Sequence, residues 1–148
     1  MGFPGVRGGI GLLAAGLLLA GCTTFDSRWE AATAAGTSSK GPEGRWEGRW
    51  TSINQDHSDD LRCLLVRIND HTCHAEFHAT FNDAIDFDHA LDLAVKPTDK
   101  GYAFHGQEDR PWFKGGRCYI TGQIVGDHLT ATYLDKVDHG TFEATRVK

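Results

Sequence analysis

Residues 117–134 read RCYITGQIVGDHLTATYL, and their alternation decides the fold prediction. Polar residues alternate with small or apolar ones on both sides of Gly126-Asp127; the small or apolar set is Cys118, Ile120, Gly122, Ile124, Leu129, Ala131 and Tyr133. A two-residue turn there pairs Ile124 with Leu129, so the inward residues of the two strands fall opposite one another. The stretch therefore predicts an antiparallel hairpin with one buried face.

The same period of two recurs from Arg45 onward in eight runs, separated by Gly, Asn or Asp: 45–53, 60–68, 72–81, 84–95, 101–107, 117–125, 128–134 and 140–147. Short connections favour a meander of antiparallel neighbours. Eight strands in one meander suit a closed barrel, because closure leaves no exposed sheet edge. We therefore predict an all-β, eight-stranded up-and-down antiparallel barrel, with a β-sandwich as the alternative.

The hairpin that joins 60–68 to 72–81 leaves its register open. A turn at Asn69-Asp70 places Leu64, Val66 and Ile68 on the face of Cys73, and Cys63 then points outward, opposite Glu76. A three-residue turn at 67–69 instead sets Cys63 opposite Cys73. We expect no disulfide; a Cys73–Cys118 bridge inside the barrel is the other option.

The amino terminus has the three parts of an export signal. Arg7 supplies positive charge, residues 10–20 form an apolar stretch too short to span a bilayer, and Leu19-Ala20-Gly21-Cys22 closes it. These last four residues resemble the lipobox of bacterial lipoproteins. The resemblance implies cleavage before Cys22 and acylation of its thiol; an ordinary secretory signal and a helical anchor are the alternatives.

The resemblance also implies a location. Thr23 stands where an aspartate marks inner-membrane retention in enterobacterial lipoproteins. We therefore expect a lipid-anchored protein of the bacterial cell envelope, in the outer membrane and facing the periplasm. Residues 1–21 would be the signal peptide, 22–44 a flexible tether rich in Ala, Thr, Ser and Gly, and 45–148 the barrel domain.

Composition and the absence of known catalytic motifs exclude several classes of function. The chain has 148 residues and a formal net charge of −5, which suits one domain and argues against a nucleic-acid partner. The sequence contains no nucleophile motif and no phosphate-binding loop. We expect neither catalysis nor a cofactor, and no sequence feature identifies a protein partner.

The first run contains a Gly-x-Trp pattern at Gly44, Trp46, Gly48 and Trp50, and an arginine, Arg146, ends the last run. This combination resembles the calycin superfamily: lipocalins, fatty-acid-binding proteins and avidins. The resemblance implies that the tryptophan plugs one barrel end beneath the arginine, so we expect Arg146 to stack on Trp46 or Trp50.

A second resemblance covers the same stretch. A group of bacterial proteins of unassigned activity shares Trp-x-Gly-x-Trp and ends near Asp-His-Gly-x-Phe-Glu, here Asp138 to Glu143. That likeness implies no particular activity.

The inferred interior mixes large and small residues, which leaves room for a small apolar or amphiphilic ligand. The candidate ligand-binding residues are aromatic or carry polar tips among aromatics: Trp50, Phe77, Phe81, His89, Tyr102, Phe104 and Tyr133. A barrel filled by these side chains, acting as a structural or interaction module, is the alternative. In that case loops such as 108–115, with Trp112 and Phe113, would meet a partner.

A third possibility is metal binding on the outer face. His74, Glu76 and His78 share one side of their strand, and a turn at 82–84 would set His78 opposite Asp88. Such side chains bind Zn²⁺ or Cu²⁺, but they equally form a solvated face of cross-strand pairs. The sequence shows no tight ligand spacing, so we predict no metal site.

Overall fold

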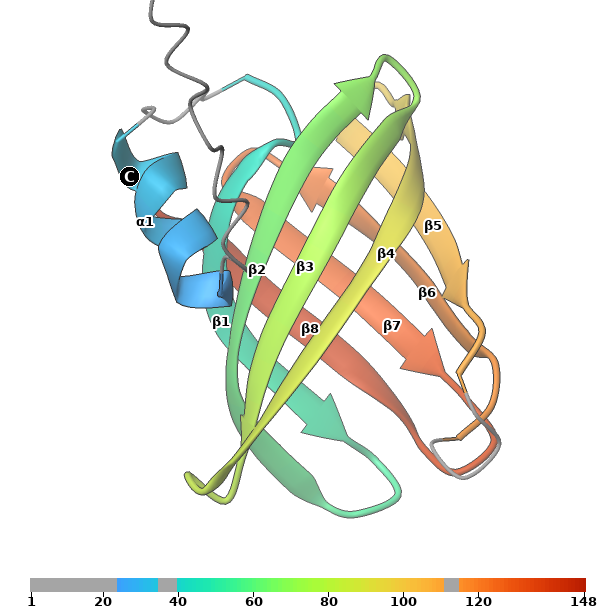
Figure 1. Ribbon diagram of the computed structural model, residues 1–148. Coiled ribbons are helices and arrows are strands. Elements are labelled where there is room, and N and C mark those ends of the chain that lie inside the picture. Colours follow the sequence, from blue (N-terminus) through green and yellow to red (C-terminus); the bar gives the residue numbers. More distant parts are fainter. Residues whose placement is uncertain (1–23, 35–39, 111–114) are drawn as a thin grey trace, which may run out of the picture.

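The computed structural model describes residues 24–34, 40–110 and 115–148. Within them a helix, α1 (Phe25–Ala34), precedes eight strands: β1 (Gly44–Ser52), β2 (His57–Asn69), β3 (Thr72–Phe81), β4 (Ile85–Pro97), β5 (Gly101–Glu108), β6 (Cys118–Val125), β7 (His128–Leu134) and β8 (His139–Arg146) (Figure 1). Each strand pairs with its neighbour in the chain, and β8 returns to β1. The predicted closed antiparallel barrel is confirmed, and the sandwich alternative is wrong.

Two predicted registers are confirmed residue by residue. In β6 and β7, Ile124 lies opposite Leu129 across the Gly126-Asp127 turn. In β3 and β4, His78 lies opposite Asp88. In both hairpins the turn is short, and only one pairing of the two strands puts their apolar residues on the same face. The turn length and the alternation therefore predict the same register.

Neither of the two registers considered for β2 against β3 is the one that forms. The pairing shifts between Arg67 and Asn69, so that Cys63 faces Phe77 inside the barrel and Glu76 faces Leu64 instead of Cys63. The irregularity adds one residue to β2. The side chains of β2 that point inward are therefore the alternate set to those that the Asn69-Asp70 turn would place inward. Leu64, Leu65 and Val66 are contiguous apolar residues, so the sequence alone could not show which of them point into the barrel and which point outward.

One barrel end is closed by Trp46 and Arg146, which lie directly opposite each other where β1 meets β8. The Arg146 guanidinium carbon lies 4.3 Å from the centroid of the Trp46 ring, so the expected cation–π contact forms at Trp46. Arg146 also donates to the Gly41 and Glu43 carbonyls, both at 2.7 Å, and the Trp46 indole N–H donates to the Pro42 carbonyl at 3.2 Å. We call this the closed end.

Residues 25–34 differ from the tether expected over 22–44. They form α1, which packs on the outside of the barrel against β1, β2 and β3 (Figure 1). Phe25 and Trp29 are only 7% and 4% exposed, because they pack on Leu64. Arg28 also donates to both carboxylate oxygens of Glu76, from Nε at 2.9 and 2.8 Å and from Nη2 at 2.5 Å. Tertiary packing stabilises this short helix, whose sequence pattern is too weak to predict it.

We predict that Gly48→Ala destabilises the barrel. A Cβ at Gly48 would lie 1.8 Å from the Glu143 carbonyl oxygen, so the β1–β8 backbones must separate. The free energy of unfolding should fall by ~1–3 kcal/mol or more in urea titrations. Glu47→Ala, an exposed change one residue away, is the control and should stay within ~0.5 kcal/mol. Equal stability of both variants would contradict the close approach.

A second prediction concerns the closed end. Arg146→Lys keeps the charge but loses the planar fork that reaches two backbone carbonyls and covers the Trp46 ring. We expect a loss of ~1–3 kcal/mol in the free energy of unfolding. Arg49→Lys, on an exposed arginine of β1, should change it by less than ~0.5 kcal/mol. A wild-type denaturation midpoint for Arg146→Lys would show that the closure needs only a positive charge.

Candidate functional site

The barrel interior differs between its two halves. Toward the closed end the inward-facing side chains are buried, among them Trp46, Leu65, Ala75, Leu93, Phe104, Ile124 and Leu129. Toward the other end, solvent reaches the inward-facing side chains of Trp50, Ala79, Phe81, Phe87, His89, Tyr133 and Phe142. We call this second set the open half. Even the inward alanine of this half, Ala79, stays partly exposed.

Aromatic rings line the open half as a connected group. The His57 and Phe81 ring centroids are 4.4 Å apart, and Trp50 lies 5.5 Å from His57 and 6.3 Å from Phe81. Phe87 meets Phe81 edge-on at 6.4 Å. Such rings offer a large apolar surface with few rotatable bonds, which suits contact with an apolar chain.

The indole and hydroxyl groups of the open half form hydrogen bonds within the protein. The Trp50 indole N–H donates to the Thr80 carbonyl at 2.9 Å. The Tyr133 hydroxyl donates to Asp138 at 2.7 Å, and Ser52 donates to the same carboxylate at 2.6 Å. Burial, with a smaller effect of Asp138, raises the pKa of Tyr133 well above 10, so the hydroxyl stays a donor at neutral pH.

Asp59 carries charge beside the aromatic group. It is buried and lies 3.3 Å from the His57 ring nitrogen. Burial alone would raise the pKa of Asp59, but N–H donors of Asp60 and Asn82, together with His57, hold it below 3.8. The carboxylate is therefore ionised at neutral pH and keeps the β1–β2 and β3–β4 hairpins together.

The wall of the open half is interrupted between β4 and β5. Their ladder is limited to the four pairs from Ala94–His105 to Pro97–Tyr102, toward the closed end. Nearer the open end, the His89 ring nitrogen and the Glu108 carboxylate lie 3.4 Å apart and bridge the two strands. Phe87 and His89 therefore lie on the part of β4 that is not paired with β5.

The structure divides the predicted ligand-binding residues between the two halves. Trp50, Phe81, His89 and Tyr133 lie in the open half, and buried Phe77 adjoins it by stacking on Phe142 at 5.3 Å. Phe104 is part of the filled closed half, and Tyr102 lies near the closed end, its hydroxyl 3.4 Å from the Lys40 carbonyl. Of the predicted closure residues, Trp46 and Arg146 meet, whereas Trp50 lies at the other end.

Sequence reasoning missed several residues of the open half. His57 and Asp59 precede the run expected to begin at residue 60, and Ser52 and Asp138 lie at strand ends. Asp59 has a recognisable signal, because a carboxylate two residues after a histidine on one strand shares its face. No local pattern links Asp138 to Ser52, which lies 86 residues away.

The predicted outer-face histidines form cross-strand pairs. His74 lies 2.7 Å from Asp92, and His78 lies 2.7 Å from Asp88. Glu76 is instead bound by Arg28 of the helix. Within the described residues no group of three His, Cys, Asp or Glu side chains could hold a metal ion. The geometry therefore gives no support to a metal site at His74, Glu76, His78 and Asp88.

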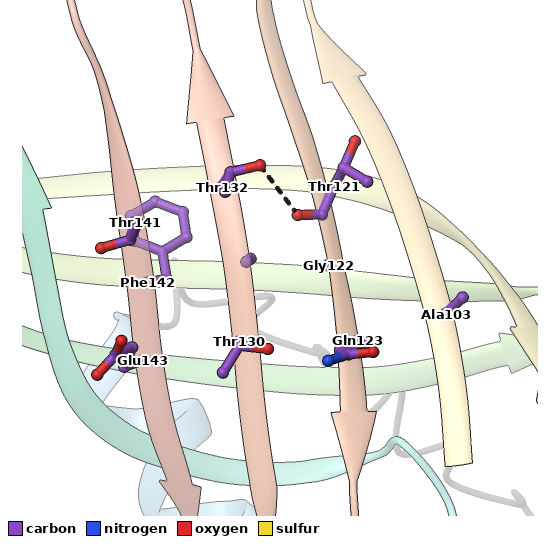
Figure 2. A pocket seen from close by; sticks show the side chains of 10 residues that line it. Ala103, Thr121, Gly122, Gln123, Thr130, Thr132, Thr141, Phe142 and Glu143 are labelled. Carbon is purple, nitrogen blue, oxygen red and sulfur yellow. Dashed lines mark hydrogen bonds between the residues drawn. The ribbon is translucent and has the colours of Figure 1, made fainter. Parts of the chain in front are cut away.

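Two hollows lie on the outside of the barrel wall. One, of about 390 Å³, runs over β5 to β8, where threonine side chains surround the small residues Gly122 and Ala131 (Figure 2). Its single side-chain link is a 3.5 Å hydrogen bond from Thr132 to the Thr121 carbonyl. The other, of about 400 Å³, lies over β1 to β3, beside Arg62 and His78. Both are open to solvent on the outer wall.

The three cysteines of the barrel, Cys63, Cys73 and Cys118, are buried free thiols. Burial raises the pKa of each of them, so they are protonated and unreactive at neutral pH. Cys22, Trp112 and Phe113 lie outside the described residues. No protein-family model, curated protein or solved structure matches the chain, so the site rests on its geometry alone.

We predict that Asp59→Asn destabilises the protein at neutral pH but not in acid. Because the folded-state pKa lies below 3.8, the ionised carboxylate contributes stability above that value and loses it as the pH falls through the folded-state pKa. Urea titrations should show a gap in the free energy of unfolding between wild type and Asp59→Asn at pH 7 that narrows as the pH falls through the folded-state pKa. Asp60→Asn, on an exposed neighbour, should show no such gap. A gap independent of pH would contradict the role of the charge.

Proposed function

We propose that the protein is a non-catalytic lipoprotein of the bacterial cell envelope, anchored through Cys22, whose barrel binds a small apolar or amphiphilic molecule in its open half. The observation that carries the binding proposal is the contrast between the filled closed half and the solvent-accessible aromatic rings of the open half. Its resemblance to calycin barrels agrees with this arrangement. The likeness rests on Trp46, Gly48, Trp50 and Arg146.

The anchor is inferred from Leu19-Ala20-Gly21-Cys22, which lies outside the described residues. Two or more acyl chains hold a protein firmly on a bilayer, since each buried methylene contributes ~0.8 kcal/mol. Within the described residues no helix is both long and apolar enough to cross a membrane. Thr23 favours the outer membrane, facing the periplasm.

The expected ligand is amphiphilic because both kinds of group line the open half. Trp50, Phe81 and Phe87 offer ring faces to an apolar chain. His89 and Glu108 lie at the interruption between β4 and β5, where a polar head would remain in water. An apolar chain buried against the rings with its head at this side opening satisfies both surfaces.

A second candidate is an interaction module with a filled barrel. The observation that favours it is that the Trp50 and Tyr133 polar groups are already satisfied within the protein. A ligand would then meet only ring surfaces and the His89–Glu108 pair, and the open end would instead serve as a contact surface.

Dodecylphosphocholine, below its micelle-forming concentration, tests the binding proposal on residues 23–148, which include every described residue. We predict one bound molecule in native mass spectrometry and saturable heat in calorimetry. Ala79→Leu should weaken binding at least tenfold, because the added branch fills the open half. Ala103→Leu, the same change on the outer wall of β5, is the matched control and should bind as wild type does.

Equal binding by wild type and Ala79→Leu would reject the open half as the binding site. Absence of binding by the folded wild type would favour the interaction module. Circular dichroism of each variant separates lost binding from lost folding.

A further inference from the structure

Three carboxylates line the open half, each from a different element. Asp59 belongs to β2, Glu108 to β5, and Asp138 to the connection between β7 and β8. Asp59 accepts from its own hairpins, and Asp138 accepts from the Tyr133 and Ser52 hydroxyls. The Glu108 side chain is 27% exposed and lies beside the His89 ring, so its charge is the one that a ligand can approach.

The positive charges of the strands lie away from the open half. Arg49 and Arg62 are on the outer wall, where they pair with Asp60 and with the helix α1, and Arg146 is at the closed end. Within residues 40–110 and 115–148, no lysine or arginine faces the open half from a strand. The carboxylates are therefore not neutralised by strand cations.

The connections at the open end keep the same sign. Arg110 is bound by the Asp135 carboxylate, and Arg117 lies 2.6 Å from Asp109, so each of these pairs is neutral as a unit. The exposed Lys136 is the remaining cation of these connections within the described residues, and it is outnumbered by exposed carboxylates such as Asp56 and Asp83. A cleft with one sign of charge attracts ligands of the opposite sign.

An independent observation points to the same charge. Arginine lies over two of the three tryptophans in the described residues: Arg146 over Trp46 at 4.3 Å, and Arg45 over Trp29 at 5.3 Å. The third, Trp50, contacts aromatic rings and has no arginine over it within the described residues. Since the face of an indole ring attracts a cation and repels an anion, Trp50 favours a positively charged ligand group.

We propose that the open half selects amphiphiles with a cationic head, an amine or a quaternary ammonium group, over amphiphiles with an anionic head. The selection rests on the ligand binding proposed above for the open half and adds the sign of the ligand's charge. The head lies at Glu108, beside the part of β4 that is not paired with β5, and the apolar chain lies on the rings of Phe87 and Trp50. A carboxylate head at the same place would meet charge of its own sign.

Three probes with the same twelve-carbon chain test the selection: dodecyltrimethylammonium, dodecylphosphocholine and dodecanoate. Each is titrated below its micelle-forming concentration into residues 23–148 by calorimetry, at low ionic strength and about pH 8, above the range in which histidines usually titrate. We expect dodecyltrimethylammonium to bind at least tenfold more tightly than dodecanoate, with dodecylphosphocholine between them. Equal affinities, or tighter binding of dodecanoate, would overturn the proposal.

A matched pair of variants separates the site from the acidic surface as a whole. Glu108→Gln should reduce the ratio of the two affinities at least threefold. Glu143→Gln removes the same charge from the outer wall of β8, where Glu143 is exposed, and should leave the ratio as in wild type. An equal effect of both variants would show that the net charge of the protein attracts the cation, and would overturn the proposal.

Two further variants locate the bound cation. Phe87→Leu replaces a ring that is 42% exposed by an apolar side chain, so it should weaken dodecyltrimethylammonium at least threefold and change dodecanoate less. Ala79→Leu should weaken dodecyltrimethylammonium at least tenfold. Wild-type affinity in Ala79→Leu would place the cation elsewhere and overturn the proposal. Circular dichroism confirms that each variant is folded.

Failure of the selection differs from failure of the proposed function. If the three probes bind in the open half with the same affinity, ligand binding stands and the charge selection is overturned. If the folded wild type binds none of them, the proposed ligand binding fails and the selection is overturned with it.

Discussion

The pairing of β1 with β8 is the constraint on which the rest of the molecule depends. It closes the sheet, and it sets Trp46 directly opposite Arg146. Closure is possible because Gly48 carries no side chain where the β8 backbone approaches. The arginine then covers the indole and binds the carbonyls of Gly41 and Glu43, so the chain before β1 is drawn across the same end.

This closure makes the barrel asymmetric. Large side chains fill the half beneath Trp46, whereas the half around Trp50, Phe81 and Phe87 stays accessible and is interrupted between β4 and β5. The docked helix adds a second asymmetry, because it covers the outer wall of the barrel at β1, β2 and β3.

Local patterns predicted the strands well and the tertiary contacts unevenly. The β6–β7 register followed from one turn and one unambiguous alternation around Ile124 and Leu129. The β2–β3 register did not, because Leu64, Leu65 and Val66 fit either phase and a one-residue irregularity selects between them. The candidate site was predictable as inward aromatic rings, but Phe104 and Phe81 have the same alternation and lie in different halves, a difference that closure alone creates.

Sequence by itself determined the all-β class, the eight strands and the antiparallel order, because each follows from alternation and turn residues. The resemblance to calycins implied an Arg146–tryptophan contact but left Trp46 and Trp50 as alternatives, and the structure selects Trp46. Only the tertiary structure decided which half of the barrel is filled, that α1 docks through Phe25 and Trp29, and that Asp138 joins Ser52 to Tyr133. Those features depend on residues far apart in the chain. Their energies come from packing and hydrogen bonds that exist only once the sheet has closed.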